Sequence, residues 1–285
     1  MVQRHISKMP RRRADSHKRD YGHVLVVAGS LGMTGAAYLA SQAAITSGCG
    51  LVTLAIPRSL NVIAETKLTE VMTLPLSETK DMSLSAKAQK QLLDFSLSMN
   101  AVALGPGLSR NTETQKLIRA LIQKIKKPLV LDADGISALQ GHQQALKDRR
   151  FPTVLTPHPG EMSRLIKKDT TYIQKNRIHV AKRVSKDYNC VTVLKGHRTV
   201  VSSTDGEIYV NKTGNSGMST AGVGDVLTGM LASFIAQGID AYSASVVAVY
   251  LHGLAGDLAA KELGQFGMIA SDLLARIPHV LKDAI

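Results

Sequence analysis

The sequence contains no tryptophan, and aromatic residues make up only 4% of its 285 residues. The apolar interior must therefore be built from alanine, leucine, valine and isoleucine, which suits helices packed on a parallel sheet. No aromatic residues alternate with the basic ones, so the stacking platforms of many nucleic-acid-binding proteins are missing. The longest apolar runs are too short, and too often interrupted by glycine, to predict a membrane span.

Cysteine is also scarce. Cys49 and Cys190 lie far apart in apolar surroundings, and neither has the spacing of a metal site. We expect two buried, reduced thiols in a cytoplasmic protein.

The common phosphate-binding motifs are absent from this chain. The pattern Gly-x-x-x-x-Gly-Lys-Ser/Thr does not occur. The first apolar strand is followed by Gly29-Ser-Leu-Gly32-Met-Thr-Gly35, whose spacing differs from the dinucleotide-binding pattern Gly-x-Gly-x-x-Gly. Phosphate chemistry must therefore rest on another architecture.

The charge is strongly basic, with a formal net charge of +13. Residues 1–20 carry seven lysines or arginines against two aspartates. We expect residues 1–15 to form a basic arm that is disordered or loosely docked, followed by one domain over residues 16–285. A basic body attracts anionic ligands such as nucleotides. Non-specific nucleic-acid binding is the alternative from another class of function, and the missing aromatic residues argue against it.

The most informative segment is residues 211–225, which contains four glycines and ends in a carboxylate, Asp225. The residues that follow are apolar at helical spacing, so the segment predicts a glycine-rich loop leading into a buried helix. The first N–H groups of such a helix have no partner and can hold phosphate. A carboxylate in the first turn is a candidate base for a hydroxyl beside that phosphate. A simple helix cap is the alternative, but a cap does not require four glycines.

Strand-like and helix-like segments alternate along the whole chain, which predicts a doubly wound, mostly parallel α/β sheet with helices on both faces. Asp205-Gly206 adds a late hairpin turn. The expected strands are 24–28, 51–56, 101–104, 129–131, 153–157, 190–194, 199–203 and 208–210. The expected helices are 36–45, 84–98, 114–126, 171–187, one beginning near 225, 241–260 and 270–283.

Distinctive residues follow five of these strands. They are Gly29–Gly35, Gly105–Gly107, Asp132 with Asp134, His158 with Glu161, and Lys195 with His197. Ligands of open α/β sheets bind at the carboxyl ends of the strands. We therefore expect one long crevice for a large anionic ligand set.

Single residues in this crevice leave alternatives open. Asp132 can hold a water, a hydroxyl or magnesium, whereas capping is favoured for Asp134. His158 suits hydrogen bonding to a substrate. Glu161 either favours the helix dipole or holds a water on a phosphate-bound Mg²⁺. Lys195 either neutralises a nucleotide phosphate or lies in a solvated basic turn.

Together these motifs resemble the ADP/ATP-dependent NAD(P)H-hydrate dehydratase family, which has a ribokinase-like fold. The resemblance runs from about residue 16 to the C-terminus. It rests on segments 17–23, 29–36, 104–107, 131–134, 156–161, 194–196 and 213–229. Arg19 and Val223 depart from the family pattern, which usually has glycine and threonine at these positions.

The resemblance implies a repair reaction on the S-form of NADH or NADPH hydrate, in which water has added at nicotinamide C6. ADP or ATP would phosphorylate the 6-hydroxyl in the presence of Mg²⁺, and loss of phosphate would restore NAD(P)H. It also implies a homotetramer, and a separate NAD(P)H-hydrate epimerase in the same pathway. A small-molecule kinase of the same fold, acting on a thiazole, a pyridoxal-like compound or a sugar alcohol, remains the alternative.

The resemblance also implies roles for single residues. Asp225 would be the catalytic base and contact the hydrate. The other hydrate contacts would be Ala36, Gly107 and His158. The nucleotide would be bound by Lys195, Gly196, His197, Arg198, Thr199, Asn215, Gly222 and Gly224. Glu161 would bind Mg²⁺ through a water.

Overall fold

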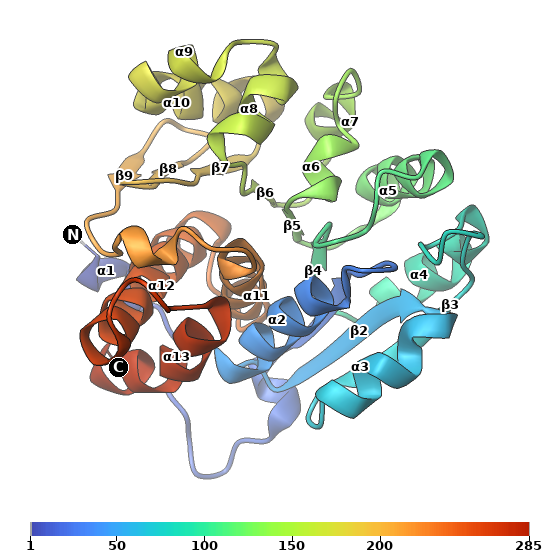
Figure 1. The fold of residues 1–285 in the computed structure, drawn as a ribbon, viewed down its shortest axis with the longest axis horizontal. Coiled ribbons are helices and arrows are strands. Elements are labelled where there is room, and N and C mark those ends of the chain that lie inside the picture. Colours follow the sequence, from blue (N-terminus) through green and yellow to red (C-terminus); the bar gives the residue numbers. More distant parts are fainter. Residues whose placement is uncertain (1, 285) are drawn as a thin grey trace.

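The computed structural model describes residues 2–284, and the strands among them form one nine-stranded sheet (Figure 1). Its order is β3-β2-β1-β4-β5-β6-β7-β8-β9. Pairing is parallel from β3 to β7, and β8 and β9 continue antiparallel as a hairpin. The strands are β1 (His23–Val27), β2 (Leu51–Pro57), β3 (Met72–Leu76), β4 (Ala101–Leu104), β5 (Leu129–Leu131), β6 (Thr153–Leu155), β7 (Val191–Leu194), β8 (Val200–Ser202) and β9 (Ile208–Val210). The predicted α/β fold class is confirmed.

The helices cover both faces of this sheet (Figure 1). They are α1 (Gln3–Ile6), α2 (Thr34–Thr46), α3 (Asn61–Lys67), α4 (Gln89–Ser96), α5 (Thr112–Lys124), α6 (Asp134–Ser137), α7 (Gln144–Lys147), α8 (Pro159–Ile166), α9 (Thr170–Lys175), α10 (Arg177–Tyr188), α11 (Val223–Ala236), α12 (Ala241–Leu263) and α13 (Ala270–Ala284). Short 3-10 turns lie at Lys18–Tyr21, Arg58–Leu60, Ala86–Ala88 and Ser216–Met218.

Alternation along the strands divides the interior into two cores. Val24 and Val26 of β1 point to the face covered by α2, α11, α12 and α13. Leu25 and Val27 point to the face covered by α4, α5, α8 and α10. Successive side chains of a strand lie on opposite faces, and here both faces are buried. This explains why the strands are continuous apolar runs.

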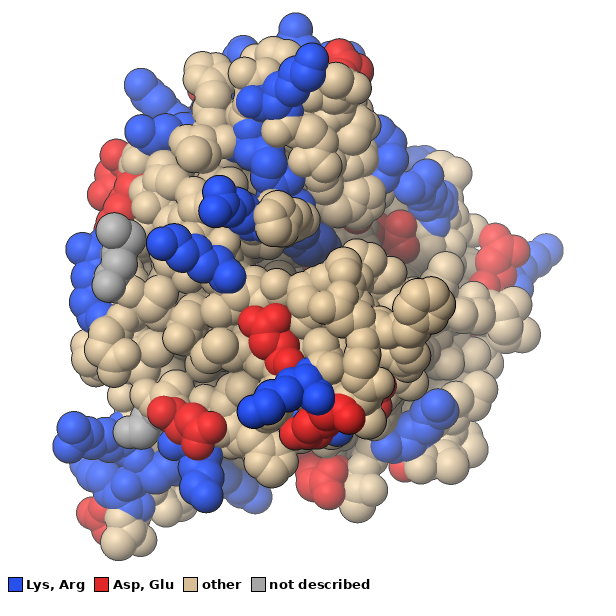
Figure 2. Space-filling model, turned by 60° about the vertical axis from the view of Figure 1, so that its left-hand side comes forward, with Lys and Arg blue, Asp and Glu red and all other residues tan. Residues whose placement is uncertain are grey.

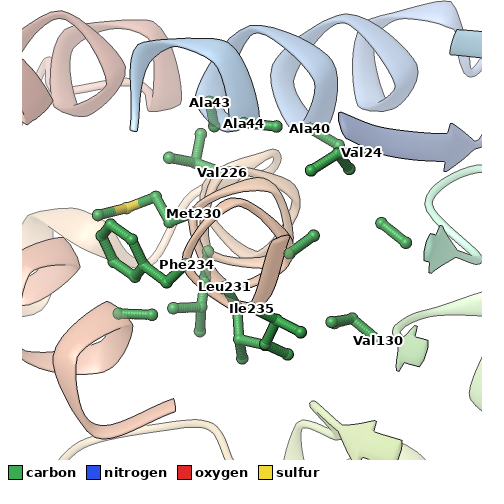
Figure 3. Close-up of a cluster of buried hydrophobic side chains, with 14 of the residues drawn as sticks. Val24, Ala40, Ala43, Ala44, Val130, Val226, Met230, Leu231, Phe234 and Ile235 are labelled. Carbon is green, nitrogen blue, oxygen red and sulfur yellow. The ribbon is translucent and has the colours of Figure 1, made fainter. Parts of the chain in front are cut away.

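Helix α11 is the centre of the first core (Figure 3). Val226, Met230 and Phe234 are all buried: Val226 lies next to Ala43 and Ala44 of α2, whereas Met230 and Phe234 point to the side of α11 away from the sheet. Gly229 allows a close approach, because a Cβ at this position would lie 2.1 Å from the backbone oxygen of Ala40 in α2. The helix that begins at the glycine-rich loop is therefore fixed rigidly in the interior.

Some local elements differ from the sequence predictions. Strand β3 was not predicted, because Pro75 interrupts its pattern, and it forms the edge of the sheet, where proline is tolerated. The helix expected over 171–187 is divided at Asn176 into α9 and α10. Short helices α1, α3 and α7 were also not predicted.

Residues 2–9 of the N-terminal segment lie against the body of the protein, which differs from the loose arm expected for residues 1–15, whereas residues 11–15 are exposed. Ile6 and Met9 are buried in the first core. His5 makes a 2.9 Å hydrogen bond to the hydroxyl of Ser243 in α12, and the Arg12 guanidinium lies 3.8 Å from the centre of the Tyr21 ring. The apolar residues between the basic ones provide this docking surface, so the charge of the segment alone does not determine whether it docks.

Two further features follow from burial. Cys49 and Cys190 are both free and buried, and burial raises the pKa of each thiol to about 12. Helix α12 is long and apolar enough to cross a membrane by length and composition, but 72% of its most apolar window is buried inside the fold. We interpret it as a core helix.

We predict that Gly229→Ala destabilises the protein, because the new methyl group would collide with the backbone of α2 rather than with a movable side chain. Gly35→Ala is the matched control, since a Cβ there meets nothing within 4 Å and Gly35 is also helical. Thermal unfolding of both variants checks this. Equal melting temperatures would show that α2 and α11 can separate at no cost.

Candidate active site

The carboxyl ends of β5 to β7 and the start of α11 enclose a cavity of about 840 Å³. Lysine and arginine side chains are numerous on the face shown in Figure 2, and several surround a hollow near its centre. The cavity is lined by Asp132, Ala133, His158, Lys195, Gly196, His197, Arg198, Thr199, Asn211, Thr213, Gly214, Asn215, Ser216, Met218, Ser219, Thr220, Ala221, Gly222, Val223, Gly224, Asp225, Leu227, Val249, His252 and Gly253. The structure thus brings together His158, Asp225 and every residue that the sequence assigned to the nucleotide.

The start of α11 has the geometry of an anion-binding turn. Gly222 is the N-cap in the left-handed region, with φ 89°. A Cβ there would also lie 2.4 Å from Leu39, so glycine is required by both conformation and space. The N–H groups of residues 223–225 open the helix and have no acceptor within it. They are free to bind phosphate at the cavity wall.

The buried His252 supports this turn from below. Its Nε2 lies 2.9 Å from the carbonyl oxygen of Val223. Burial lowers the pKa of His252 to about 4, so the ring is neutral near pH 7. Since a carbonyl oxygen can only accept a hydrogen bond, Nε2 carries the ring proton and donates the hydrogen bond to the Val223 oxygen.

Asp225 is the third residue of α11 and is only partly exposed. Burial raises its pKa to about 7, and the nearby carboxylate of Asp132 adds to this shift. Lys195 acts in the opposite direction, and Glu161 raises the pKa further. A carboxyl group with a pKa near 7 suits proton transfer at neutral pH.

Lys195 is not a free surface cation. Its Nζ lies 2.6 Å from one carboxylate oxygen of Asp132, and both side chains are largely buried. Burial lowers the pKa of Lys195, but the carboxylates of Asp132 and Glu161 outweigh this and raise it overall. The interpretation of Lys195 as part of a solvated turn does not fit this geometry. The cation is held at the cavity wall.

The strand end that carries Asp132 is strained. Ala133 has φ 47° and ψ −114°, a conformation that favours glycine. It lies between Asp132, which faces Lys195, and Asp134, whose carboxylate accepts a 2.9 Å hydrogen bond from the Ser109 N–H. The sharp turn directs two neighbouring carboxylates to different partners. Asp134 holds the loop at Ser109 and does not cap α6, whose N-cap is Ala133 without a side-chain hydrogen bond, so the capping expected for Asp134 is wrong.

His158 and Glu161 form a reciprocal cap on α8. His158 Nδ1 accepts from the Gly160 N–H at 3.0 Å, and Glu161 accepts from the His158 N–H at 2.8 Å. Burial lowers the pKa of His158 and raises that of Glu161. The His158 side chain is half exposed, so its second ring nitrogen can still reach a ligand in the cavity.

The segment 195–199 is supported by Arg177 of α10. The Arg177 guanidinium donates to the carbonyl oxygens of Leu194 and Lys195, at 2.8 and 3.2 Å. Gly196 has φ 135°, and the Thr199 hydroxyl donates to its carbonyl oxygen. The loop is therefore preformed, with its backbone along the cavity.

The second nucleotide segment, around Asn215, is held by α12. Asp257 accepts from the Gly214 N–H at 2.9 Å and from the Asn215 side-chain amide at 3.0 Å. The Asn215 amide oxygen in turn accepts from the Gly217 N–H. In this structure the Asn215 side chain stabilises its own loop.

Ala36 and Gly107 lie at the neighbouring strand ends and do not line the same cavity. A Cβ on Gly107, which has φ 62°, would lie 3.3 Å from Cβ of Ala36. The Ser30 hydroxyl donates to the Gly107 carbonyl oxygen at 2.8 Å and joins the two loops. A Cβ on Gly105 would lie 1.8 Å from the Asp132 carbonyl oxygen, so this region adjoins the cavity. The cavity itself does not reach Ala36 and Gly107, so the structure does not show the single long crevice expected from the sequence.

A protein-only metal cage is not present among residues 2–284, where no group of three or more metal-ligating side chains occurs. Mg²⁺ usually keeps several waters and takes few carboxylates in phosphate sites. Glu161 fits such a role, because only one of its carboxylate oxygens is used by the His158 N–H. Its raised pKa reflects burial, which a cation would offset.

A second cavity, of about 800 Å³, lies at the amino ends of β6 and β7, on the opposite side of the sheet from the strand ends described above. Its walls contain Arg4, Lys8, Glu207 and Asp240, which pair as Arg4–Glu207 and Lys8–Asp240. These charges neutralise one another. The cavity at the strand ends, where charges and unpaired N–H groups converge, is therefore the stronger candidate for the active site.

Sequence reasoning did not find several residues of the site. Asp132 was noted, but not as the partner of Lys195. Thr228 and His252 were not considered, since both lie within long apolar helices. The residue pairs are far apart in sequence, so no local signal reveals them.

Known proteins resemble this chain over nearly its whole length. The model of the NAD(P)H-hydrate dehydratase family matches residues 24–279. A bifunctional NAD(P)H-hydrate repair enzyme of Moorella thermoacetica is 46% identical over 277 residues, which cover 97% of this chain and 52% of that protein. The chain therefore spans about half the length of this relative. An ADP-dependent (S)-NAD(P)H-hydrate dehydratase of Neisseria meningitidis is 36% identical, over 93% of this chain and 84% of that protein.

Solved structures show the same similarity. The ADP/ATP-dependent NAD(P)H-hydrate dehydratase of Bacillus subtilis, co-crystallised with ATP and Mg²⁺, superposes with a TM-score of 0.85 and 31% identity. The alignment covers 100% of this chain and 98% of that one. Ribokinase of Thermotoga maritima has a TM-score of 0.53 and 14% identity, over 89% and 98% of the two chains, which supports the ribokinase-like fold alone.

We predict that Asp225→Asn stabilises the protein at pH 8. The folded state disfavours the charged form of Asp225, whose pKa rises from 3.8 to about 7. Between pH 3.8 and 7 Asp225 is protonated in the folded state but ionised in the unfolded state. The free energy of unfolding therefore falls as the pH rises towards 7. An amide does not carry this cost.

The measurement is the melting temperature of wild type and variant at pH 4 and pH 8. We expect a gain of a few degrees at pH 8 that nearly disappears at pH 4, where Asp225 is protonated in the folded state and titrates close to its unfolded pKa of 3.8. A variant that is less stable at pH 8 would contradict the assignment of a raised pKa.

Proposed function

This chain belongs to the NAD(P)H-hydrate dehydratase family, and from that premise we propose that it restores NADH or NADPH from the S-form of the hydrate with ADP or ATP as phosphoryl donor. The observation that carries the proposal is the placement of Asp225. It lies in the first turn of α11, beside unpaired N–H groups and the Lys195 ammonium, on the wall of a cavity of about 840 Å³.

In the first step, the 6-hydroxyl of the hydrate attacks the terminal phosphoryl group of the nucleotide. Asp225 accepts the hydroxyl proton, for which a pKa of about 7 is well matched. The N–H groups at the start of α11 and the Lys195 ammonium stabilise the charge on the phosphoryl oxygens. The nucleotide leaves one phosphate shorter.

In the second step, the phosphate leaves C6 with the electrons of the C–O bond. The lone pair of the ring nitrogen assists its departure, and the neighbouring carbon loses a proton to restore the double bond. Phosphorylation is useful because phosphate is a much better leaving group than hydroxide. The products are NAD(P)H, inorganic phosphate and the shortened nucleotide.

We place the nucleotide in the cavity and the hydrate between this cavity and the neighbouring loops that carry Ala36 and Gly107. The nucleotide occupies the cavity lined by Lys195 to Thr199, Asn215, Gly222 and Gly224. The hydrate extends from Asp225 and His158 towards Ala36 and Gly107. Val223 lacks the hydroxyl usual at this position in the family, but its backbone N–H remains available to phosphate.

Mg²⁺, held through water by Glu161 and directly by the nucleotide phosphates, would neutralise part of the phosphate charge. We further propose a homotetramer that acts in the cytoplasm together with a separate epimerase. The resemblance to the family supports these assignments.

We predict that the purified protein restores the absorbance of the reduced nicotinamide when it is mixed with NADH hydrate, Mg²⁺ and either ADP or ATP. One phosphate should be released for each NADH restored. Equal restoration in EDTA without nucleotide would contradict the proposal. A small-molecule kinase of the same fold would instead leave the hydrate unchanged and transfer phosphate to a thiazole, pyridoxal-like or sugar alcohol.

We predict that Asp225→Asn lowers the single-turnover rate by about 10²–10⁴-fold, because the amide cannot accept the proton. Nucleotide affinity should persist, since N–H groups and not this carboxylate hold the phosphates. Glu113→Gln is a matched control, because Glu113 is an acid in the first turn of α5, away from the cavity. A rate within a few-fold of wild type for Asp225→Asn would reject this residue as the base.

A further inference from the structure

Thr228 lies one turn after Asp225 on α11 and is completely buried. Its hydroxyl lies 2.8 Å from the second carboxylate oxygen of Asp132. The first oxygen of the same carboxylate pairs with Lys195 at 2.6 Å. A continuous chain of contacts therefore runs from the helix, through Asp132, to the Lys195 ammonium.

The last member of this chain of contacts, the Lys195 ammonium, lies against the first turn of α11. A Cβ built on Gly224 would lie 3.2 Å from Nζ of Lys195 and 3.9 Å from the Asp132 carboxylate. The ammonium is thus packed directly against the turn whose N–H groups face the cavity. Because Gly224 has no side chain, nothing separates this cation from that turn.

Each contact in the chain restricts one degree of freedom. A lysine side chain has four rotatable bonds, so an ammonium without a fixed partner would occupy many positions. Asp132 gives it a partner, but a carboxylate held through one oxygen can still rotate. The Thr228 hydroxyl fixes the second oxygen and so sets the plane of the carboxylate.

We propose that Thr228 is a positioning residue that, through Asp132, fixes the Lys195 ammonium beneath the phosphate-binding turn of α11. This role rests on the proposed phosphoryl transfer and deepens it. The ammonium acts on the charge that develops as the phosphoryl group moves, and such stabilisation depends strongly on placement. Thr228 itself touches neither ligand.

A purely structural role is the competing explanation, because the Thr228 hydroxyl also lies 3.1 Å from the Gly224 carbonyl oxygen, within its own helix. Such back-bonding affects only helix geometry and stability. The two explanations differ in which measured quantity changes. The positioning role changes turnover, whereas the structural role changes the melting temperature alone.

The test is Thr228→Val, which keeps the shape of the side chain and removes the hydroxyl. We expect kcat for NADH-hydrate repair to fall about 10–100-fold, the size of effect that a small misplacement of a catalytic group produces. The KM for the nucleotide should change much less, since the backbone N–H groups remain. Thr228→Ser, which restores a hydroxyl, should recover most of kcat.

Thr114→Val is the matched control, because it makes the same substitution at another buried threonine. Thr114 is equally buried, and its hydroxyl donates to the Leu84 carbonyl oxygen in the other core, far from the cavity. It should lower the melting temperature without lowering kcat. This separates the cost of a lost buried hydrogen bond from a loss of positioning.

A double-mutant cycle with Lys195→Met tests whether the loss of kcat in Thr228→Val is transmitted through Lys195. If Thr228 acts through Lys195, then Thr228→Val should cost little further activity once the ammonium is gone. Fully multiplicative losses would overturn the proposal, as would wild-type kcat in Thr228→Val. An inactive wild-type protein would instead overturn the proposed function, and with it the role assigned here to Thr228.

Discussion

The buried ion pair between Asp132 and Lys195 joins three parts of the fold that are distant in sequence. Asp132 ends β5, Lys195 follows β7, and the Thr228 hydroxyl connects the pair to α11. A buried ion pair contributes little net stability, because desolvation opposes the Coulomb attraction. The pair instead fixes geometry, because separating the two groups would leave a buried charge without a partner. The contact therefore joins the helix that carries the phosphate-binding turn to the ends of β5 and β7.

The same pair determines the electrostatics of the site. Asp132, Glu161 and Asp225 place three carboxyl groups near one ammonium. Lys195 is engaged by Asp132, so it compensates only part of the negative potential at Asp225. Burial and this surplus of negative charge together raise the pKa of Asp225 towards 7. The site therefore gives up some folding stability to obtain a base matched to neutral pH, as functional sites often do.

Much of the architecture could be predicted from local sequence patterns. Apolar runs bounded by glycine and proline located eight of the strands, because strands buried on both faces require such runs. Asp205-Gly206 indicated the hairpin, and residues 211–225 indicated the phosphate-binding turn. The rule that ligands bind at the carboxyl ends of strands correctly grouped His158, Lys195 and Asp225 at one cavity. The edge strand β3 was not found, because an edge strand tolerates the proline that obscures its pattern.

By itself the sequence thus predicted eight of the nine strands in order, the two-sided core and the grouping of His158, Lys195 and Asp225 at one cavity. Only the tertiary structure decided which site residues are in contact with one another. Asp132 meets Lys195 across 63 positions and Thr228 across 96, so no local pattern encodes either contact. The docking of the N-terminal segment and the raised pKa of Asp225 also depend on what the folded chain packs around each group. Periodicity acts over a few residues, whereas burial and charge pairing are properties of the assembled fold.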